Sequence, residues 1–305
     1  MREVLIPDHL DEVWDILERE PGASLYAGGT DLLVRLRDSK TLDPLAKNCN
    51  SVLAGQASTP TKPPGALVCL ENIHELKEIY QQGNLVFIGS CVSHTKLMEN
   101  PLIQKYFPLL IQAVKVLGSP PVRNMGTIGG NICTASPAGD TLPPLYTLGA
   151  VVEIRSIESN RLMPLKGFIK GPGKTALQKS EIVYGVWIST NQDYNVCHYE
   201  KVGQRKALAI AIASFAALLK LSESGIIEDV RFAWGSLAPV IVTSQEVERV
   251  LIGRPLTVES IRTVVPLVEK AVSPIDDVRA SACYRKMVAG NLLFRLLQYG
   301  NHGST

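Results

Sequence analysis

Two glycine-rich stretches are the strongest guide to this fold: Ala27-Gly28-Gly29-Thr30-Asp31-Leu32-Leu33 and Thr127-Ile128-Gly129-Gly130-Asn131-Ile132. The first follows the short apolar run Ser24-Leu25-Tyr26 and precedes an amphipathic stretch. Glycine pairs form tight turns, and they also let backbone N–H groups approach a phosphate with no Cβ in the way. Neither stretch is GxGxxG, so the usual Rossmann fingerprint is absent. Two such turns in one chain favour a ligand with two phosphates, such as a dinucleotide.

The residues that flank both turns resemble a known family. Arg123 through Asp140 resembles the flavin-binding segment of the xanthine dehydrogenase family, and Leu25 through Leu32 resembles its upstream counterpart. The chain is therefore similar to the separate FAD-binding (medium) subunits of molybdenum hydroxylases. The resemblance implies an α+β fold in two domains. These are an FAD-binding domain of the vanillyl-alcohol-oxidase/PCMH type with two subdomains at 1–190, and a CO-dehydrogenase-flavoprotein-type domain at 191–305, with a three-stranded antiparallel sheet and three helices.

The resemblance also implies a set of cofactor-binding residues, which share their positions with FAD contacts of the family. They are Leu25, Tyr26, Ala27, Gly28, Gly29, Thr30, Asp31, Leu32, Leu117, Thr127, Ile128, Gly129, Gly130, Asn131, Asp140, Val183 and Lys201. In this interpretation the N–H groups of both turns hold the pyrophosphate. No residue of the chain is assigned a catalytic role.

Several of these residues have a second interpretation. Asp140 fits a ligand of ribityl or ribose hydroxyls, and it also fits a helix N-cap before Thr141. Lys201 fits a positive charge near the flavin N1/C2=O edge, and equally a solvated surface lysine. Leu117 stands where the family often has an aromatic residue, so only apolar packing is expected there. We interpret Arg123 as structural.

The same resemblance implies partners and a direction of electron flow. Electrons would reach FAD from a [2Fe-2S] small subunit, after a molybdopterin-binding large subunit has hydroxylated the substrate, and would pass to NAD+ or another acceptor. One alternative is a self-sufficient FAD-dependent oxidoreductase with its own small substrate. Another is a non-catalytic interaction protein on a degenerate flavin fold.

Composition limits the remaining classes of protein. The chain has 305 residues, of which 46% are hydrophobic and 20% charged, and its net charge is +2. These values are ordinary for a globular protein, and without a basic block nucleic acid is a poor partner. The longest apolar run, 207–219, is too short to cross a bilayer, and the N-terminus lacks the apolar core of a signal peptide. We therefore expect no membrane insertion and a cytoplasmic location.

Cysteines and histidines indicate no metal site. The six cysteines form no CxxC, and the five histidines have no paired ligand spacing. We expect reduced and mostly buried thiols, including Cys133. Some relatives carry a cysteine-rich loop for an extra iron–sulfur cluster after the second turn. This chain has only Cys133 between Asn131 and Leu148, so that cluster is not expected.

Hydrophobic periodicity, together with capping and turn residues, predicts the helices and strands. Asp8 is expected to cap a first helix, 38–65 to form an inserted loop, Gly83-Asn84 to join a hairpin, and Gly171–Thr175 to be a turn between strands rather than a P-loop. Beyond a break near 189–193, strands are predicted at 196–201, 209–221 and 227–233. Helices follow at about 244–252, 258–271 and 278–299.

Overall fold

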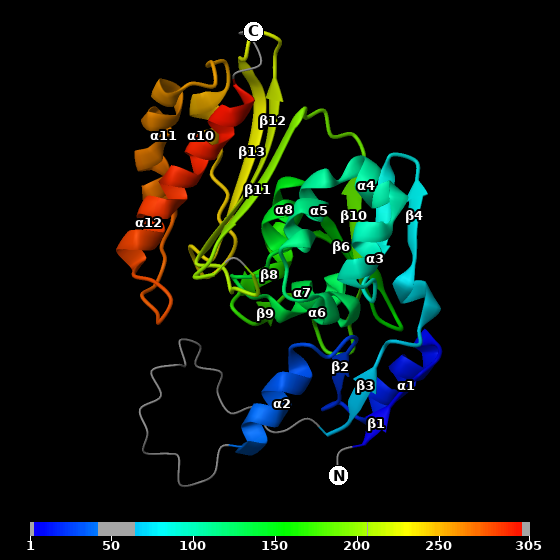
Figure 1. The fold of residues 1–305 in the computed structure, drawn as a ribbon. Coiled ribbons are helices and arrows are strands. Elements are labelled where there is room, and N and C mark those ends of the chain that lie inside the picture. Colours follow the sequence, from blue (N-terminus) through cyan, green and yellow to red (C-terminus); the bar gives the residue numbers. More distant parts are fainter. Residues whose placement is uncertain (1–2, 42–64, 206, 301–305) are drawn as a thin grey trace.

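The computed structural model describes residues 3–41, 65–205 and 207–300, with side chains 38–41 excepted. Figure 1 shows the N-terminal strands, the middle strands and the C-terminal strands following one another through the molecule, with helices between them and on the outside. No helix of the described part is long and apolar enough to span a membrane.

The N-terminal unit is a small parallel sheet with two helices. Its strands lie in the order β1 (Val4–Leu5), β3 (Leu67–Cys69) and β2 (Ser24–Tyr26). Helix α1 (Leu10–Arg19) buries Val13 and Trp14 against the sheet. The predicted Asp8 cap is wrong, because the N-cap residue is His9, without a side-chain cap bond. Helix α2 (Leu32–Thr41) also continues past the predicted loop start at 38, and residues 42–64 of that loop lie outside the described part.

The middle unit is an antiparallel five-stranded sheet covered on one face by helices. Its strand order is β4 (Ile79–Gln82), β5 (Leu85–Gly89), β10 (Ile182–Ser189), β6 (Val151–Arg155) and β7 (Asn160–Pro164). The β4–β5 hairpin turns at Gly83, whose φ of 58° suits glycine, as the sequence predicts. The helices are α3 (His94–Glu99), α4 (Pro101–Tyr106), α5 (Pro108–Lys115), α6 (Pro120–Met125), α7 (Ile128–Thr134), α8 (Leu142–Thr147) and α9 (Leu165–Phe168).

Two short elements complete this unit. Strands β8 (Ile169–Gly171) and β9 (Lys174–Thr175) form a hairpin with Gly173 at a φ of 66°, so the P-loop-like sequence is a turn between strands, as predicted. A 3₁₀ helix, η2 (His74–Lys77), precedes β4.

The C-terminal unit is an antiparallel sheet of β11 (Val196–Val202), β12 (Ala213–Leu221) and β13 (Ile227–Gly235). One face carries α10 (Gln245–Leu251), α11 (Val258–Ala271), α12 (Ala282–Asn291) and the 3₁₀ helix η3 (Leu292–Tyr299), while the other faces α5 and α8 (Figure 1). Side chains of β12 alternate between two cores: Phe215 and Ala217 pack under the outer helices, and Ala216 and Leu218 pack toward the middle unit. Burial on both faces explains why this strand reads as a continuous apolar run.

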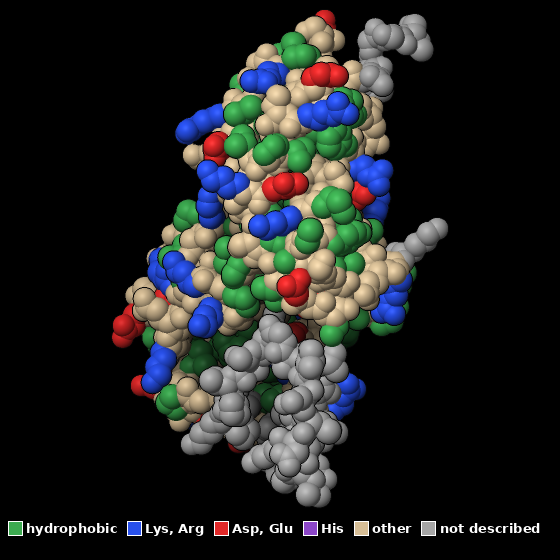
Figure 2. Space-filling model, turned by 90° about the vertical axis from the view of Figure 1, so that its left-hand side faces the viewer, with side chains coloured by type: hydrophobic (Ala, Val, Ile, Leu, Met, Phe, Trp, Pro, Cys, Tyr) green, Lys and Arg blue, Asp and Glu red, His purple; other side chains and the backbone are tan. Residues whose placement is uncertain are grey.

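Two predicted bounds in this unit are wrong. Strand β12 begins at Ala213 rather than 209, and the last helix begins at Ala282 rather than 278. Figure 2 shows the outer face with Lys and Arg side chains scattered among acidic and hydrophobic ones, and no single-sign patch is visible there.

Candidate functional site

The first glycine turn joins β2 to α2 and leaves backbone donors free. Gly29 has a φ of 66°, a conformation that favours glycine. Within the described residues, no hydrogen-bond partner is present for the N–H groups of Gly28, Gly29, Thr30 and Asp31. Four free donors in a row form the kind of cradle that binds an anionic oxygen.

The second glycine turn is built differently. Thr127 caps α7, and its Oγ1 accepts a hydrogen bond from the Gly130 N–H at 3.1 Å. The N–H groups of Ile128 and Gly129 donate to the carbonyl oxygens of Val92 and Ser90 at 3.0 and 2.9 Å. The Asn131 N–H donates to the carbonyl oxygen of Thr127. These four donors are therefore used within the chain, which corrects the expectation that they hold a phosphate.

The Asn131 side chain is the polar group that the second turn offers instead. Its Oδ1 accepts a hydrogen bond from the Thr141 hydroxyl at 2.6 Å, which fixes the orientation of the amide. In the described part of the chain the Nδ2 donor has no partner, and Asn131 is only partly buried. A ligand can thus meet a directed amide donor here.

The fold brings the two turns into direct contact. A Cβ on Gly28 would overlap the Met125 carbonyl oxygen at the end of α6, so the first turn lies against the main chain that enters the second. A Cβ on Gly126 would lie 3.4 Å from Thr30 Oγ1. Asp31 accepts a hydrogen bond from Thr134 of α7 at 3.2 Å and pairs with Arg35. The two turns are thus close enough for a single ligand to reach both.

Asp140 and Lys201 form a buried ion pair between the middle and C-terminal units. Asp140 Oδ2 lies 2.7 Å from Lys201 Nζ, and less than a tenth of each side chain is exposed. Burial raises the pKa of Asp140, while Lys201 and a hydrogen bond from Tyr199 act to lower it. Lys201 is therefore not the solvated surface lysine of the alternative interpretation. Asp140 is not a helix cap either, because the N-cap of α8 is Thr141.

The remaining predicted residues lie in supporting positions. Leu117 is buried, and its carbonyl oxygen accepts a hydrogen bond from Arg123 Nη1 at 2.9 Å, so Arg123 has the structural role expected of it. Val183 is buried in the core between the five-stranded sheet and its helices. Leu25 and Ala27 pack partly buried beside α1. Tyr26 and Leu32 end β2 and begin α2, so they frame the first turn.

Sequence reasoning missed Tyr199, whose hydroxyl donates to Asp140 Oδ1 at 3.2 Å. Strand alternation was the available signal, because residues 199 and 201 of β11 share a face. It also missed Gln112 of α5, whose amide accepts from the Tyr199 N–H at 2.9 Å and donates to the Cys197 carbonyl oxygen at 3.2 Å.

Cysteines and histidines add no metal site among the residues that the structure describes. Cys69, Cys91, Cys133, Cys197 and Cys283 are free thiols, and Cys49 lies outside the described residues. The expectation of mostly buried thiols is wrong, since Cys133 and Cys283 are exposed and Cys197 is intermediate. His94, beside the second turn, is neutral at pH 7, because burial and then Arg123 lower its pKa to about 4.

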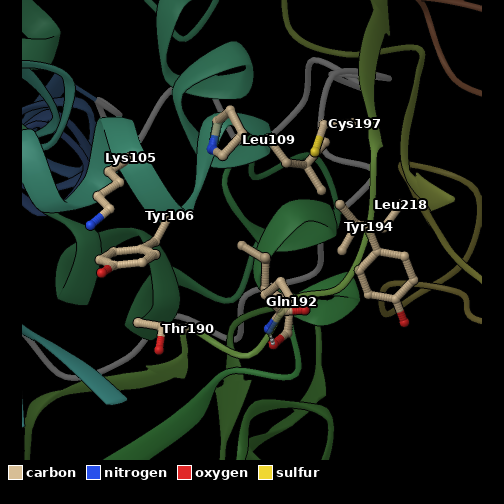
Figure 3. Close-up of a pocket in the computed structure, with 10 residues that line it drawn as sticks. Lys105, Tyr106, Leu109, Thr190, Gln192, Tyr194, Cys197 and Leu218 are labelled. Atoms are coloured by element: carbon tan, nitrogen blue, oxygen red, sulfur yellow. Dashed lines mark hydrogen bonds between the residues drawn. The ribbon is translucent and has the colours of Figure 1, made fainter. Parts of the chain in front are cut away.

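A small cavity of about 150 Å³ lies away from the glycine turns, where α4 and α5 meet the chain between β10 and β11. Figure 3 shows Lys105 and Cys197 on opposite sides of the view, with the Gln192 side chain between and below them. The Gln192 amide donates to the carbonyl oxygens of Leu148 and Ser189, so it ties down the connection between units. None of the predicted site residues lines this cavity.

The first turn offers free backbone N–H groups, and the second offers the Asn131 amide. An ion pair, Asp140–Lys201, links the middle and C-terminal units. These features are typical of a cofactor-binding subunit. The family model of the FAD binding domain in molybdopterin dehydrogenase matches residues 44–189, and that of the CO dehydrogenase flavoprotein C-terminal domain matches residues 198–299. The chain belongs to this family of FAD-binding medium subunits of molybdenum hydroxylases, and it is an oxidoreductase subunit.

Individual relatives match this chain over most of their length. The glyceraldehyde dehydrogenase medium chain of Sulfolobus acidocaldarius is 30% identical over 246 residues, 79% of this chain and 86% of the relative. The nicotinate dehydrogenase FAD-subunit of Eubacterium barkeri is 27% identical over 289 residues, 93% of this chain and 90% of the relative. A solved structure of carbon monoxide dehydrogenase from Hydrogenophaga pseudoflava matches with a TM-score of 0.85 and 25% identity, covering 98% of this chain and 96% of that one.

Proposed function

We propose that this subunit binds FAD where its two glycine turns meet, with the pyrophosphate on the first turn. The observation that carries this assignment is the row of free N–H groups from Gly28 to Asp31, next to a turn whose own backbone donors are occupied. The Asn131 amide then supplies a donor from the second turn. The residues present therefore fit a dinucleotide, with unequal roles for the two turns.

Asp140 and Lys201 are proposed to act on the flavin half of the cofactor. Their pairing gives the site a carboxylate that accepts hydroxyl hydrogen bonds and a cation that favours negative charge nearby. When bound, FAD supplies the redox chemistry of the subunit. Leu117 and Val183 are proposed as apolar packing residues, which fits their burial.

We further infer the domain organisation and the partners. A boundary near 190 separates an FAD-binding domain of the vanillyl-alcohol-oxidase/PCMH type from a C-terminal domain. A [2Fe-2S] small subunit would deliver electrons that originate at a molybdopterin-binding large subunit, and NAD+ or another acceptor would take them. The match to the Eubacterium barkeri nicotinate dehydrogenase FAD-subunit, over 93% of this chain, supports a role within such a complex. A cytoplasmic location stays a prediction of the sequence.

The test is an affinity purification of the native complex, with the visible spectrum, the metal content and the co-eluting chains recorded. Flavin absorbance with iron, molybdenum and two additional chains is the expected result. Flavin in a lone chain that a small molecule reduces would replace the proposal with the self-sufficient oxidoreductase. A chain without flavin would support the non-catalytic interaction protein.

A further inference from the structure

The ion pair of Lys201 and Asp140 has a third member, because the Tyr199 hydroxyl also binds the Asp140 carboxylate. Asp140 has two oxygens, and each has one partner from β11: Lys201 Nζ on Oδ2 at 2.7 Å and the Tyr199 hydroxyl on Oδ1 at 3.2 Å. Residues 199 and 201 share one face of the strand, so a single strand orients both partners toward the same carboxylate. Because both carboxylate oxygens are hydrogen-bonded, the Asp140 side chain is restricted in its rotation.

The strand that carries both partners is itself fixed. Strand β11 is an edge strand, and its free edge at residues 197–199 is closed by the side chain of Gln112. This amide donates to the Cys197 carbonyl oxygen and accepts from the Tyr199 N–H, as a neighbouring strand would. Lys201 gains a further anchor at the Val116 carbonyl oxygen, 3.3 Å away. The position of Tyr199 is thus determined from α5 as well as from the sheet.

The geometry points to Tyr199 as the positioning residue that orients Asp140, and through it Lys201, toward bound FAD, with Gln112 holding Tyr199 in place. This inference rests on the proposed function of the site. Tyr199 donates this hydrogen bond as a neutral phenol, because burial and the adjacent Asp140 raise its pKa well above the usual value and keep its hydroxyl protonated. The stability of a buried ion pair depends on such added hydrogen bonds, because the attraction between the charges offsets the cost of their desolvation only when the geometry is good.

Removal of this hydroxyl has a consequence that a merely structural role would not have. The Tyr199 hydrogen bond lowers the pKa of Asp140, so without it the carboxylate becomes protonated at a higher pH. The groups that act on Asp140 are Lys201 and Tyr199, both from β11. If FAD retention depends on the ionised carboxylate, then the pH at which FAD is released rises when the hydroxyl is lost.

The experiment compares the full-length wild-type chain with Tyr199→Phe and the matched control Tyr194→Phe. Tyr194 also donates to a carboxylate, Asp229 Oδ2 of β13 at 2.7 Å, and it lies just before β11, but Asp140 is not among its hydrogen-bond partners. FAD affinity is measured by fluorescence titration from pH 5 to 8, and folding of the FAD-free chains is checked by circular dichroism. We expect FAD to bind about tenfold more weakly to Tyr199→Phe, with half-release at a higher pH, and unchanged binding to Tyr194→Phe.

A folded Tyr199→Phe chain with the affinity and release pH of the wild type would overturn the inference. Should Tyr199→Phe fail to fold, Gln112→Met provides the second variant, with the same direction of change expected and wild-type retention as the contradicting result. A wild-type chain that binds no FAD would refute the proposed function instead, which is a distinct outcome.

Discussion

Gly28 lies so close to Met125 that a Cβ on residue 28 would overlap the Met125 carbonyl oxygen. The neighbouring Gly126 nitrogen would be 3.1 Å from the same Cβ. Backbone atoms cannot move aside as a flexible side chain can, so this contact depends on the absence of a side chain. The close contact between the two glycine turns therefore requires that residue 28 has no side chain.

Gly28→Ala is expected to separate the turns and to abolish FAD retention. The added methyl group forces a main-chain shift that costs about 3 kcal/mol of unfolding free energy. Urea unfolding and the flavin spectrum of the purified variant measure both effects. Gly22→Ala is the control, because its Cβ would have no heavy atom within 4 Å. A Gly28→Ala chain with full FAD content would contradict the contact.

Gly129→Val is also expected to abolish FAD retention, although not for the reason that the sequence suggested. The sequence predicts that the valine blocks a phosphate, whereas the structure has a Cβ on Gly129 overlapping Ser90 Cβ and lying 2.7 Å from the Ser90 carbonyl oxygen. The variant should therefore be destabilised by about 3 kcal/mol even without FAD. Gly130→Ala is the milder comparison, since that Cβ would be 3.0 Å from Thr127 Oγ1 alone. Equal stability of the FAD-free Gly129→Val and wild-type chains would restore the phosphate explanation.

Lys201→Met leaves the Asp140 carboxylate buried without its cation. Loss of one partner from a buried pair costs about 3 kcal/mol of stability, and the variant should also bind FAD more weakly. Thermal unfolding at pH 7 and FAD titration test both statements. Lys220→Met removes the more exposed pair with Asp193 and should leave FAD binding unchanged. Wild-type stability of Lys201→Met would mean that the pair does not join the two units.

Asp277 is expected to give the C-terminal unit an acid-sensitive contribution to stability. Burial acts to raise the pKa of Asp277, but hydrogen bonds from Arg279 and Arg285 outweigh it and lower this pKa from 3.8 to about 2. Because the folded-state pKa is depressed, the stabilisation is present above pH 3.8 and is lost as the pH falls toward 2.

Asp277→Asn should then lower the unfolding free energy by about 2 kcal/mol at pH 7, with a difference that shrinks below pH 4. Urea denaturation across this pH range measures the effect. Asp193→Asn, whose side chain is 88% exposed, should show no such dependence. A difference between Asp277→Asn and wild type that persists unchanged at pH 2 would refute the assignment.

The sequence predicted the elements whose signals are local. Gly83 turns a hairpin, and Gly173 lies in the turn between β8 and β9, because turn chemistry is set by near neighbours. The wrong cap at Asp8 shows the limit of this reasoning, since an acceptor in the right place need not be used. The start of β12 was missed because an apolar run does not mark where pairing begins.

The site was predicted less completely, since its decisive contacts join distant parts of the chain. No local pattern indicates that Ser90 and Val92 occupy the donors of the second turn, or that Gln112 closes the edge of β11. The pairing of Asp140 with Lys201 was likewise invisible in sequence, although both residues were selected by resemblance. Tyr199 was within reach, because strand alternation aligns it with Lys201.

FAD content, measured on the purified chain and on a variant of the first glycine turn, shows whether this turn holds the cofactor. Gly29→Pro removes one of the free N–H donors and cannot adopt the positive φ of this residue. FAD is released by heat and quantified against protein, while circular dichroism follows the fold. We expect one FAD per wild-type chain and none in a folded Gly29→Pro chain. Equal FAD in the two folded chains would contradict the claim that the first glycine turn holds the cofactor.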